Sequence, residues 1–180
     1  MTDATTLLAR LASRDATVVV LGQGYVGLVL AMRASEAGFA VVGVEPDASR
    51  AASLAKGSSY VDDVPDEVLQ TALDREYRAV STAEEIPEFD VAVIAVPTPL
   101  HEGRPDLGAI EEAARWTGQA LRAGALVVLE STTYPGTTRE LLVPLLEERS
   151  GLRCGDDFLA GYSPERIDPG NPEFTLVSTP

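Results

Sequence analysis

A glycine-rich turn that directly follows an apolar segment constrains the fold of this chain more than any other feature. Residues 16–21 are apolar or β-branched on both faces, which is typical of a strand buried in a parallel sheet. Gly22-Gln-Gly24-Tyr-Val-Gly27 follows at once and opens a predicted helix over residues 28–37. Strand, glycine turn and helix in this order indicate a dinucleotide-binding unit rather than a turn used only for packing. In such a unit Gly22 permits the tight turn, Gly24 leaves room for a pyrophosphate, and Gly27 lets the helix approach the strand.

Apolar strand segments alternate with helical segments along almost the whole chain. After the first strand, we predict strands over residues 40–44, 78–81, 91–96, 125–130 and 158–162. Helices are predicted over residues 5–13, 48–56, 66–73, 107–122 and 137–149. Asp47 can cap the second of these, Thr137 or Thr138 can cap the last, and Thr82-Ala-Glu-Glu85 matches a capping box. This alternation predicts an α/β fold, a Rossmann-type doubly wound parallel sheet with helices on both faces. We assign residues 1–14 to an N-terminal helical extension and residues 15–180 to the dinucleotide-binding domain.

Composition excludes several classes of function. Acidic residues outnumber basic ones 28 to 14, for a net charge of −14, so the chain lacks the basic face that binding to nucleic acid requires. Cys154 is the single cysteine, which leaves no disulfide within the chain and fits a reducing compartment. The N-terminus does not resemble a signal peptide, and no stretch approaches the roughly 18 apolar residues of a membrane span. We therefore expect a cytoplasmic protein that contacts neither membrane nor nucleic acid and holds no metal.

The second predicted strand ends at an acid that identifies the cofactor. Glu45 lies on the order of 20 residues beyond the glycines, where a carboxylate accepts hydrogen bonds from the hydroxyls of the adenosine ribose. The same carboxylate would repel a 2′-phosphate, so the pattern favours NAD over NADP. Arg50 lies near enough to reach a phosphate, or it is simply a surface residue of the following helix.

Polar and turn-forming residues collect where the predicted strands end. Ligands of open parallel sheets bind at the carboxyl ends of the strands. These ends fall at residues 22–27, 45, 96–99, 130–133 and 162–166.

Five blocks of this sequence resemble the UDP-glucose/GDP-mannose dehydrogenase family, in the family's order. They are Gly22-Gln-Gly-Tyr-Val-Gly-Leu28, Val96-Pro-Thr-Pro-Leu100, Pro105-Asp-Leu107, Glu130-Ser-Thr-Thr-Tyr-Pro-Gly-Thr-Thr138 and Tyr162-Ser-Pro-Glu-Arg-Ile-Asp-Pro-Gly170. The last block departs from the Phe-Leu pattern of the UDP-glucose and GDP-mannose enzymes. It is similar to the branch that acts on UDP-N-acetylhexosamines such as UDP-N-acetylglucosamine.

The resemblance implies an NAD-dependent oxidation of a sugar C6 alcohol to the acid, with two NAD used in turn and a cysteine that traps the intermediate aldehyde. It also implies residue roles. Tyr25 and Val26 would contact the pyrophosphate through their backbone. Pro97 and Thr98 would border the adenosine half of NAD.

At the other end of the cofactor, the resemblance implies that Ser131 and Thr132 lie near the nicotinamide, with Thr132 holding a catalytic water. Glu165 would act as general base near the reacting carbon. Glu165 and Arg166 would contact the UDP-sugar. Without the resemblance, Thr132 could equally be a loop hydroxyl and Glu165 a surface carboxylate.

The family's cysteine nucleophile and its lysine have no counterpart in this sequence, since neither Cys154 nor Lys56 matches their motifs. We expect the central dimerisation helix and the C-terminal UDP-sugar domain to be absent from this chain, which would then be inactive alone. Full-length relatives would form homodimers or larger assemblies. Trp116 is expected to be exposed where the missing domain docks. The alternatives are a UDP-glucose 6-dehydrogenase, a non-catalytic NAD-binding module, and another hydroxyacid-type dehydrogenase.

Overall fold

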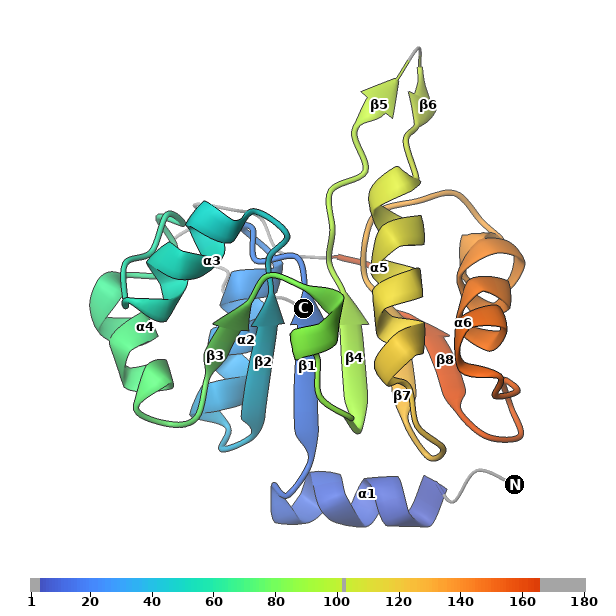
Figure 1. Cartoon of the computed structure of the whole chain (residues 1–180), viewed down its shortest axis with the longest axis horizontal. Coiled ribbons are helices and arrows are strands. Elements are labelled where there is room, and N and C mark those ends of the chain that lie inside the picture. The colour runs from blue at the N-terminus through green and yellow to red at the C-terminus, as the bar shows by residue number, and fades with distance from the viewer. Residues whose placement is uncertain (1–3, 102, 166–180) are drawn as a thin grey trace.

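A computed structural model of the chain describes residues 4–101 and 103–165, and its centre is a parallel sheet of six strands (Figure 1). The strands are β1 (Thr17–Leu21), β2 (Ala40–Val44), β3 (Arg78–Val80), β4 (Val91–Ile94), β7 (Leu126–Leu129) and β8 (Leu159–Tyr162). Their order across the sheet is β3-β2-β1-β4-β7-β8, and every neighbouring pair is parallel. The order reverses direction beside β1, as in doubly wound dinucleotide-binding sheets. The predicted fold class is confirmed.

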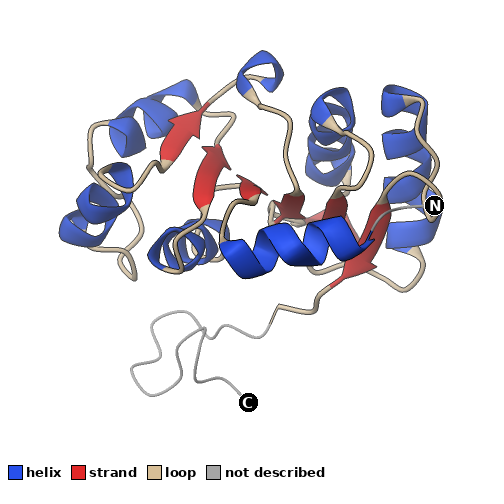
Figure 2. Cartoon of the chain, turned by 90° about the horizontal axis from the view of Figure 1, so that it is seen from below, coloured by secondary structure: helices blue, strands red, loops and turns tan. Residues whose placement is uncertain are grey.

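Helices cover both faces of this sheet (Figure 2). The helices on the faces are α2 (Gly27–Glu36), α3 (Ala48–Ala55), α4 (Asp66–Leu73), α5 (Gly108–Ala120) and α6 (Val143–Ser150), and a further helix, α1 (Ala4–Ser13), lies at the amino ends of the strands. A 3-10 turn, η1 (Ala83–Glu85), precedes β4, and a π-helical turn, η2 (Thr138–Leu142), leads into α6. Two short strands, β5 (Leu100–His101) and β6 (Arg104–Pro105), form an antiparallel hairpin that projects above the sheet.

Two hydrophobic cores lie on opposite faces of the sheet because successive strand residues point to opposite sides. Val18 and Val20 of β1 join the core formed with α2, α3 and α4. Val19 and Leu21 of the same strand join the core formed with α5, η2 and α6. A central strand buried on both sides explains why residues 16–21 read as one continuous apolar segment.

Short-range sequence signals gave most of the helix ends correctly. The Asp47 side chain accepts hydrogen bonds from the backbone N–H groups of Ser49 and Arg50 and caps α3. Thr82 and Glu85 form the predicted capping box.

One local prediction was wrong, and one element was missed. Thr137 does not cap a helix, because its hydroxyl contacts the Tyr134 carbonyl and the Thr133 hydroxyl, and the segment after it is a π-turn. The β5–β6 hairpin was not predicted, since its strands of two residues carry no periodic pattern.

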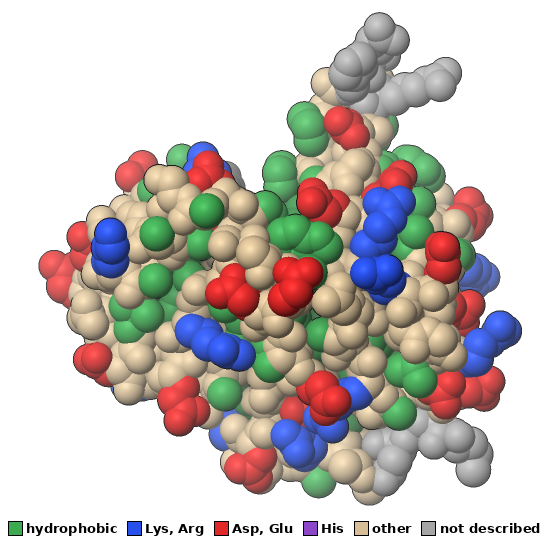
Figure 3. All heavy atoms as spheres, viewed as in Figure 1, with side chains coloured by type: hydrophobic (Ala, Val, Ile, Leu, Met, Phe, Trp, Pro, Cys, Tyr) green, Lys and Arg blue, Asp and Glu red, His purple; other side chains and the backbone are tan. Residues whose placement is uncertain are grey.

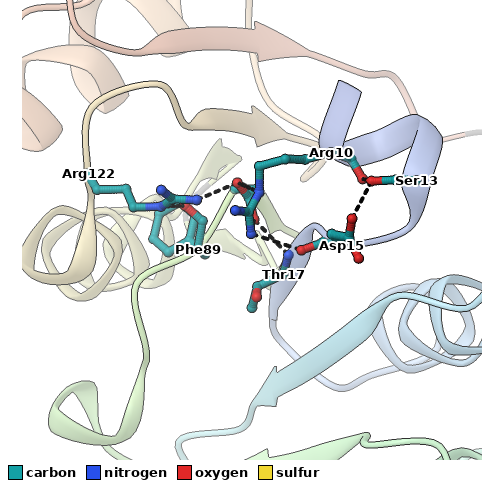
Figure 4. A network of polar contacts seen from close by, with 7 residues as sticks. Arg10, Ser13, Asp15, Thr17, Phe89 and Arg122 are labelled. Carbon is teal, nitrogen blue, oxygen red and sulfur yellow. Dashed lines mark hydrogen bonds and ion pairs between the residues drawn. The ribbon is translucent and has the colours of Figure 1, made fainter. Parts of the chain in front are cut away.

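Helix α1 lies below the amino ends of the strands and is joined to them by a buried carboxylate (Figure 4). The Asp90 carboxylate is 4% exposed and pairs with Arg10 Nε at 2.8 Å and with the Arg122 guanidinium. It also accepts a hydrogen bond from the Thr17 N–H at 2.8 Å. This network fixes the amino edge of the sheet. The proposed domain boundary at residues 14 and 15 remains a prediction.

None of the helices in the described part of the chain has both the length and the apolar character needed to cross a membrane.

Candidate functional site

A cleft of about 590 Å³ runs along the carboxyl edge of the sheet, at the end opposite α1. Figure 3 shows the surface hollowed between the lobe of α3 and the projecting hairpin. The cleft is lined by most residues that the sequence analysis selected: Gly22, Gly24, Tyr25, Val26, Glu45, Arg50, Pro97, Thr98, Ser131, Thr132 and Glu165. Gly27 lies behind the turn, and Arg166 falls outside the described residues.

The glycine turn forms the floor of the cleft. Gly22 has a φ of +89°, and a Cβ built there would lie 2.5 Å from the Ala95 carbonyl oxygen of the neighbouring strand. A Cβ at Gly27 would overlap the Gly22 carbonyl oxygen, so any larger residue would displace the turn. Nothing lies within 4 Å of the Cβ position of Gly24, and the space above it opens into the cleft.

The start of α2 adds hydrogen-bond donors to this floor. The N-cap residue Val26 provides no side-chain acceptor, so the first N–H groups of α2 are not capped by its side chain. Uncapped N–H groups and the positive end of a helix dipole are what a phosphate group binds. Open space above Gly24 and an uncapped helix therefore fit a pyrophosphate.

One half of the cleft, over β2, holds a fully partnered acid. Glu45 is 8% exposed, and its Oε1 accepts a hydrogen bond from the Asp47 N–H at 3.1 Å. The Tyr60 hydroxyl donates to the Gln23 carbonyl at 2.8 Å and lies 3.3 Å from Glu45 Oε2. Burial, and then the Glu45 charge, raise the pKa of Tyr60, so this hydroxyl stays a neutral donor. The Arg50 guanidinium lies 5.1 Å from the centre of the Tyr60 ring, at the rim of the cleft.

Gln23 is a site residue that the sequence analysis missed. Its side chain is fully buried, and its Nε2 donates to the carbonyls of Val20 at 2.9 Å and Gly22 at 3.1 Å. Its Oε1 accepts a hydrogen bond from the Tyr77 hydroxyl at 2.9 Å. Gln23 thereby fixes the glycine turn to the sheet. No sequence signal could have shown this, because Tyr77 is 54 residues away along the chain.

In the other half of the cleft, two loops are joined through hydroxyl groups. Ser131 Oγ donates to the Val96 carbonyl at 2.8 Å, and Thr98 Oγ1 donates to the Thr132 carbonyl at 2.7 Å. The loops after β4 and β7 are therefore held together. The side chain of Thr132 is exposed and lines the cleft.

Two acids face the same half of the cleft. Glu130 directly follows β7, and its Oε2 atom is buried without a hydrogen-bond partner. Burial, and then the charge of Glu165, raise the pKa of Glu130 to about 7. The sequence analysis placed Glu130 at a strand end without giving it a role. Its neighbour Glu165 lies beyond β8 and is distant in the chain, so no local pattern could show that the two acids meet.

Trp116 lines the cleft, whereas Cys154 does not. The expectation that Trp116 is exposed was wrong, because it packs against the core of α5 and α6 and lines the cleft. Cys154 lies outside the cleft, and burial raises the pKa of its thiol. Within residues 4–101 and 103–165, no group of three or more His, Cys, Asp or Glu side chains could hold a metal ion.

Comparison with known proteins identifies the family of this chain. Residues 16–179 match the model of the UDP-glucose/GDP-mannose dehydrogenase family, NAD binding domain. The chain is 39% identical over 166 residues to a UDP-N-acetyl-D-glucosamine 6-dehydrogenase of Pseudomonas aeruginosa, an alignment that covers 92% of this chain and 39% of the relative. It is 36% identical over 157 residues to a UDP-glucose 6-dehydrogenase of Haloferax volcanii, covering 84% of this chain and 36% of the relative.

Solved structures of similar dehydrogenases share the fold of this chain. A UDP-D-ManNAc dehydrogenase from Pyrococcus horikoshii superimposes with a TM-score of 0.80 at 35% identity, over 86% of this chain and 37% of that one. A GDP-mannose dehydrogenase from P. aeruginosa, solved as a ternary complex, gives a TM-score of 0.78 at 32% identity, over 84% of this chain and 36% of that one. The chain spans about two fifths of the length of the curated relatives that it matches.

Proposed function

The chain belongs to the UDP-glucose/GDP-mannose dehydrogenase family and forms its NAD-binding domain, and from this membership we propose the activity of the whole protein. That activity is the oxidation of the C6 hydroxyl of a UDP-N-acetylhexosamine, similar to UDP-N-acetylglucosamine, to the uronic acid with two NAD. The observation that carries the proposal is the cleft itself. It combines an open glycine turn, a buried acid over β2 and a second group of acids over β7.

Each half of the cleft has its own role in this proposal. The turn from Gly22 to Gly27 and the start of α2 bind the pyrophosphate, with Tyr25 and Val26 contributing backbone contacts. Glu45 accepts hydrogen bonds from the ribose hydroxyls, because Tyr60 and the Asp47 N–H hold it in place from behind. Arg50, at the rim, is available to a phosphate.

In the second half, Pro97 and Thr98 form the border between the two ends of the dinucleotide. Ser131 and Thr132 lie beside the nicotinamide, and the exposed Thr132 hydroxyl holds a water. When bound, NAD supplies the acceptor for the hydride that leaves C6. Glu165 receives the proton of the sugar hydroxyl, and Arg166 contacts the substrate.

The choice of an N-acetylhexosamine as substrate is supported by the substrates named for several relatives. Curated relatives of 34–39% identity include dehydrogenases of UDP-N-acetyl-D-glucosamine and UDP-N-acetyl-D-mannosamine. A UDP-glucose 6-dehydrogenase at 36% identity makes UDP-glucose the second candidate substrate. Comparing the two UDP-sugars as substrates of the whole protein decides between them.

A non-catalytic NAD-binding module is the other alternative. Such a module needs the glycine turn and Glu45, but it has no use for a pair of acids at the far end of the cleft. The presence of Glu130 and Glu165 there favours the dehydrogenase. Assembly of the whole protein as a homodimer or larger, and its location in the cytoplasm, belong to the same proposal.

Calorimetric titration of the chain with NAD and NADP tests the cofactor site. We expect NAD to bind, NADP to bind at least tenfold more weakly, and Glu45→Ala to remove most of the NAD affinity. Glu88→Ala is the matched control, because Glu88 is exposed and does not line the cleft. If neither dinucleotide binds, or if Glu88→Ala weakens NAD as much as Glu45→Ala does, the cofactor site is wrongly assigned.

A further inference from the structure

We propose that Glu130, beside Glu165 at the nicotinamide end of the cleft, is partly protonated near pH 7, and that binding of oxidised cofactor expels this proton whereas binding of reduced cofactor does not. This inference rests on the proposed function, since it requires NAD in the cleft. It adds Glu130 to the cofactor site as a residue that distinguishes the two redox states of the nicotinamide.

The topology of the sheet brings the two acids together. Strands β7 and β8 are adjacent and parallel, with Leu129 aligned with Tyr162. Glu130 follows Leu129 directly. The Ser163 N–H donates to the Leu129 carbonyl at 3.0 Å, so the two segments of the chain remain hydrogen-bonded just past the end of β8. Glu165 lies two residues further on, and both acids line the cleft.

The direction of the dinucleotide follows from the other half of the cleft. Glu45 ends β2, which lies on one side of β1, and it is the acid placed to bind the adenosine ribose. The pyrophosphate binds at the turn that follows β1. The remaining half of the dinucleotide must then extend over β4 and β7, where Glu130 and Glu165 lie.

The charged side chains that line the cleft are mostly acidic. The titratable groups that line the cleft, besides the pair, are Tyr25, Glu45, Arg50, Tyr60 and Glu112. Arg50 is the cation among these described residues, and it stacks on Tyr60 at the adenosine side. Burial, and then the neighbouring Glu165 charge, raise the pKa of Glu130 to about 7. In the free protein near pH 7, Glu130 is therefore partly protonated.

The two redox states of the cofactor affect this proton differently. The nicotinamide ring is a cation in NAD⁺ and is neutral in NADH. A cation beside Glu130 favours its carboxylate and lowers its pKa, which releases a proton. At pH 7 a carboxyl that is half protonated can release at most about half a proton per NAD⁺ bound. A neutral ring gives no such release.

The same coupling suits the reaction. Oxidation of the alcohol is R–CH₂OH + NAD⁺ → R–CHO + NADH + H⁺, in which the C–H electron pair leaves with the hydride and the hydroxyl proton needs an acceptor. Before the step, Glu130 is ionised beside the cationic ring and can act as that acceptor together with Glu165. After the step, the positive charge is gone and the pair retains the proton.

Titration calorimetry of the chain in two buffers with different ionisation enthalpies measures the proton directly. At pH 7 we expect release of a few tenths of a proton with NAD⁺, and none with NADH or with ADP-ribose, which lacks the nicotinamide. Glu130→Gln should abolish the release. Glu165→Gln should reduce it, because loss of the neighbouring charge lowers the pKa of Glu130 and leaves less proton to release in the free protein.

Glu112→Gln is the matched control, because it removes another carboxylate of the same cleft and should leave the release unchanged. ADP-ribose binding by each variant verifies that the turn and Glu45 are intact. Equal release with all three ligands, release that persists in Glu130→Gln, or NAD⁺ binding without release would each overturn the inference and leave the cofactor site standing. Failure of every ligand to bind wild-type protein would overturn the proposed function and the inference with it.

Discussion

Two acids, the buried Asp90 and the partly buried Glu130, lie at opposite edges of the sheet, and their surroundings differ. Asp90, at the amino edge, pairs with Arg10 and Arg122 and accepts the Thr17 N–H. Glu130, at the carboxyl edge, has one buried oxygen without a hydrogen-bond partner and a second acid for a neighbour. A buried charge is costly unless it is paired and hydrogen-bonded. The amino edge is thus built for stability, and the carboxyl edge for a ligand that brings the missing partners.

Helix α1 is attached to the amino edge of the sheet through this network of polar contacts (Figures 1 and 4). The helix supplies Arg10 to Asp90 and contributes only Leu7 to the buried residues. Its distance from the cleft predicts that changes there alter folding and leave cofactor binding intact. Variants at the two edges should therefore separate stability from binding.

The largest expected effect is at the amino edge. Asp90→Asn should lower the free energy of unfolding by about 2–3 kcal/mol, because it leaves Arg10 and Arg122 beside an uncharged group. The loss is smaller than for a fully buried ion pair, because both arginine side chains are partly exposed to water. Urea denaturation measures it. Glu88→Gln, an exposed acid two residues away, is the control and should change stability by less than about 0.5 kcal/mol. A similar small loss for Asp90→Asn would remove the contrast between the edges.

The next effect is at the carboxyl edge and concerns binding alone. Gly24→Ala should leave stability within about 0.5 kcal/mol of wild type, because no atom lies within 4 Å of the new Cβ. Its NAD affinity should fall at least tenfold, about 1.4 kcal/mol, because the methyl group occupies the space of the pyrophosphate. Gly161→Ala is the matched control: it also has open space but does not line the cleft. Calorimetry that finds equal NAD affinity in both variants would place the pyrophosphate elsewhere.

A smaller effect depends on pH. The folded pKa of Glu130, about 7, lies above its ordinary value of 4.5, so the native state binds more protons than the unfolded chain between these values. The contribution of Glu130 to the free energy of unfolding is therefore largest below pH 4.5, and it is lost as the pH rises from about 4.5 to 7. Because the side chain is only partly buried, Glu130→Gln should be more stable than wild type by about 1 kcal/mol at pH 8 and equal to it near pH 4. Urea denaturation at both pH values measures this, and a difference that does not vary with pH would contradict it.

The smallest effect tests the attachment of α1. Arg10→Gln should lower the free energy of unfolding by about 0.5–1 kcal/mol, because its side chain is 40% exposed and water screens the pair. NAD affinity should not change. Arg33→Gln serves as the control. Arg33 forms an ion pair with Glu36 in which both side chains are exposed, so its loss should lower the free energy of unfolding by less. An effect of Arg10→Gln on NAD binding would show that the edges are coupled.

Local sequence patterns predicted most of the helices and strands, because caps, apolar segments and glycine stops act over a few residues. Asp47 capping α3 and the turn at Gly22 are of this kind. The π-turn at Thr138 and the β5–β6 hairpin were missed, because neither has a periodic pattern.

The candidate site was predicted to a similar degree. The residues on the glycine turn, Glu45 and the strand-end loops were identified because the carboxyl ends of parallel strands must meet at one edge. Their roles in binding and catalysis remain predictions. Gln23, Tyr60 and Trp116 were missed or misjudged, because each has a partner that is distant in the chain.

The amino-acid sequence by itself determined the alternation of strands and helices, the dinucleotide turn and the acid at Glu45, because each depends on residues close together in the chain. Only the tertiary structure decided which of two strand-flanking acids would be paired with arginines. Asp90 and Glu130 both flank apolar strands, and nothing near them in the sequence distinguishes the two. The difference arises because the fold brings Arg10 and Arg122 to one edge of the sheet and Glu165 to the other.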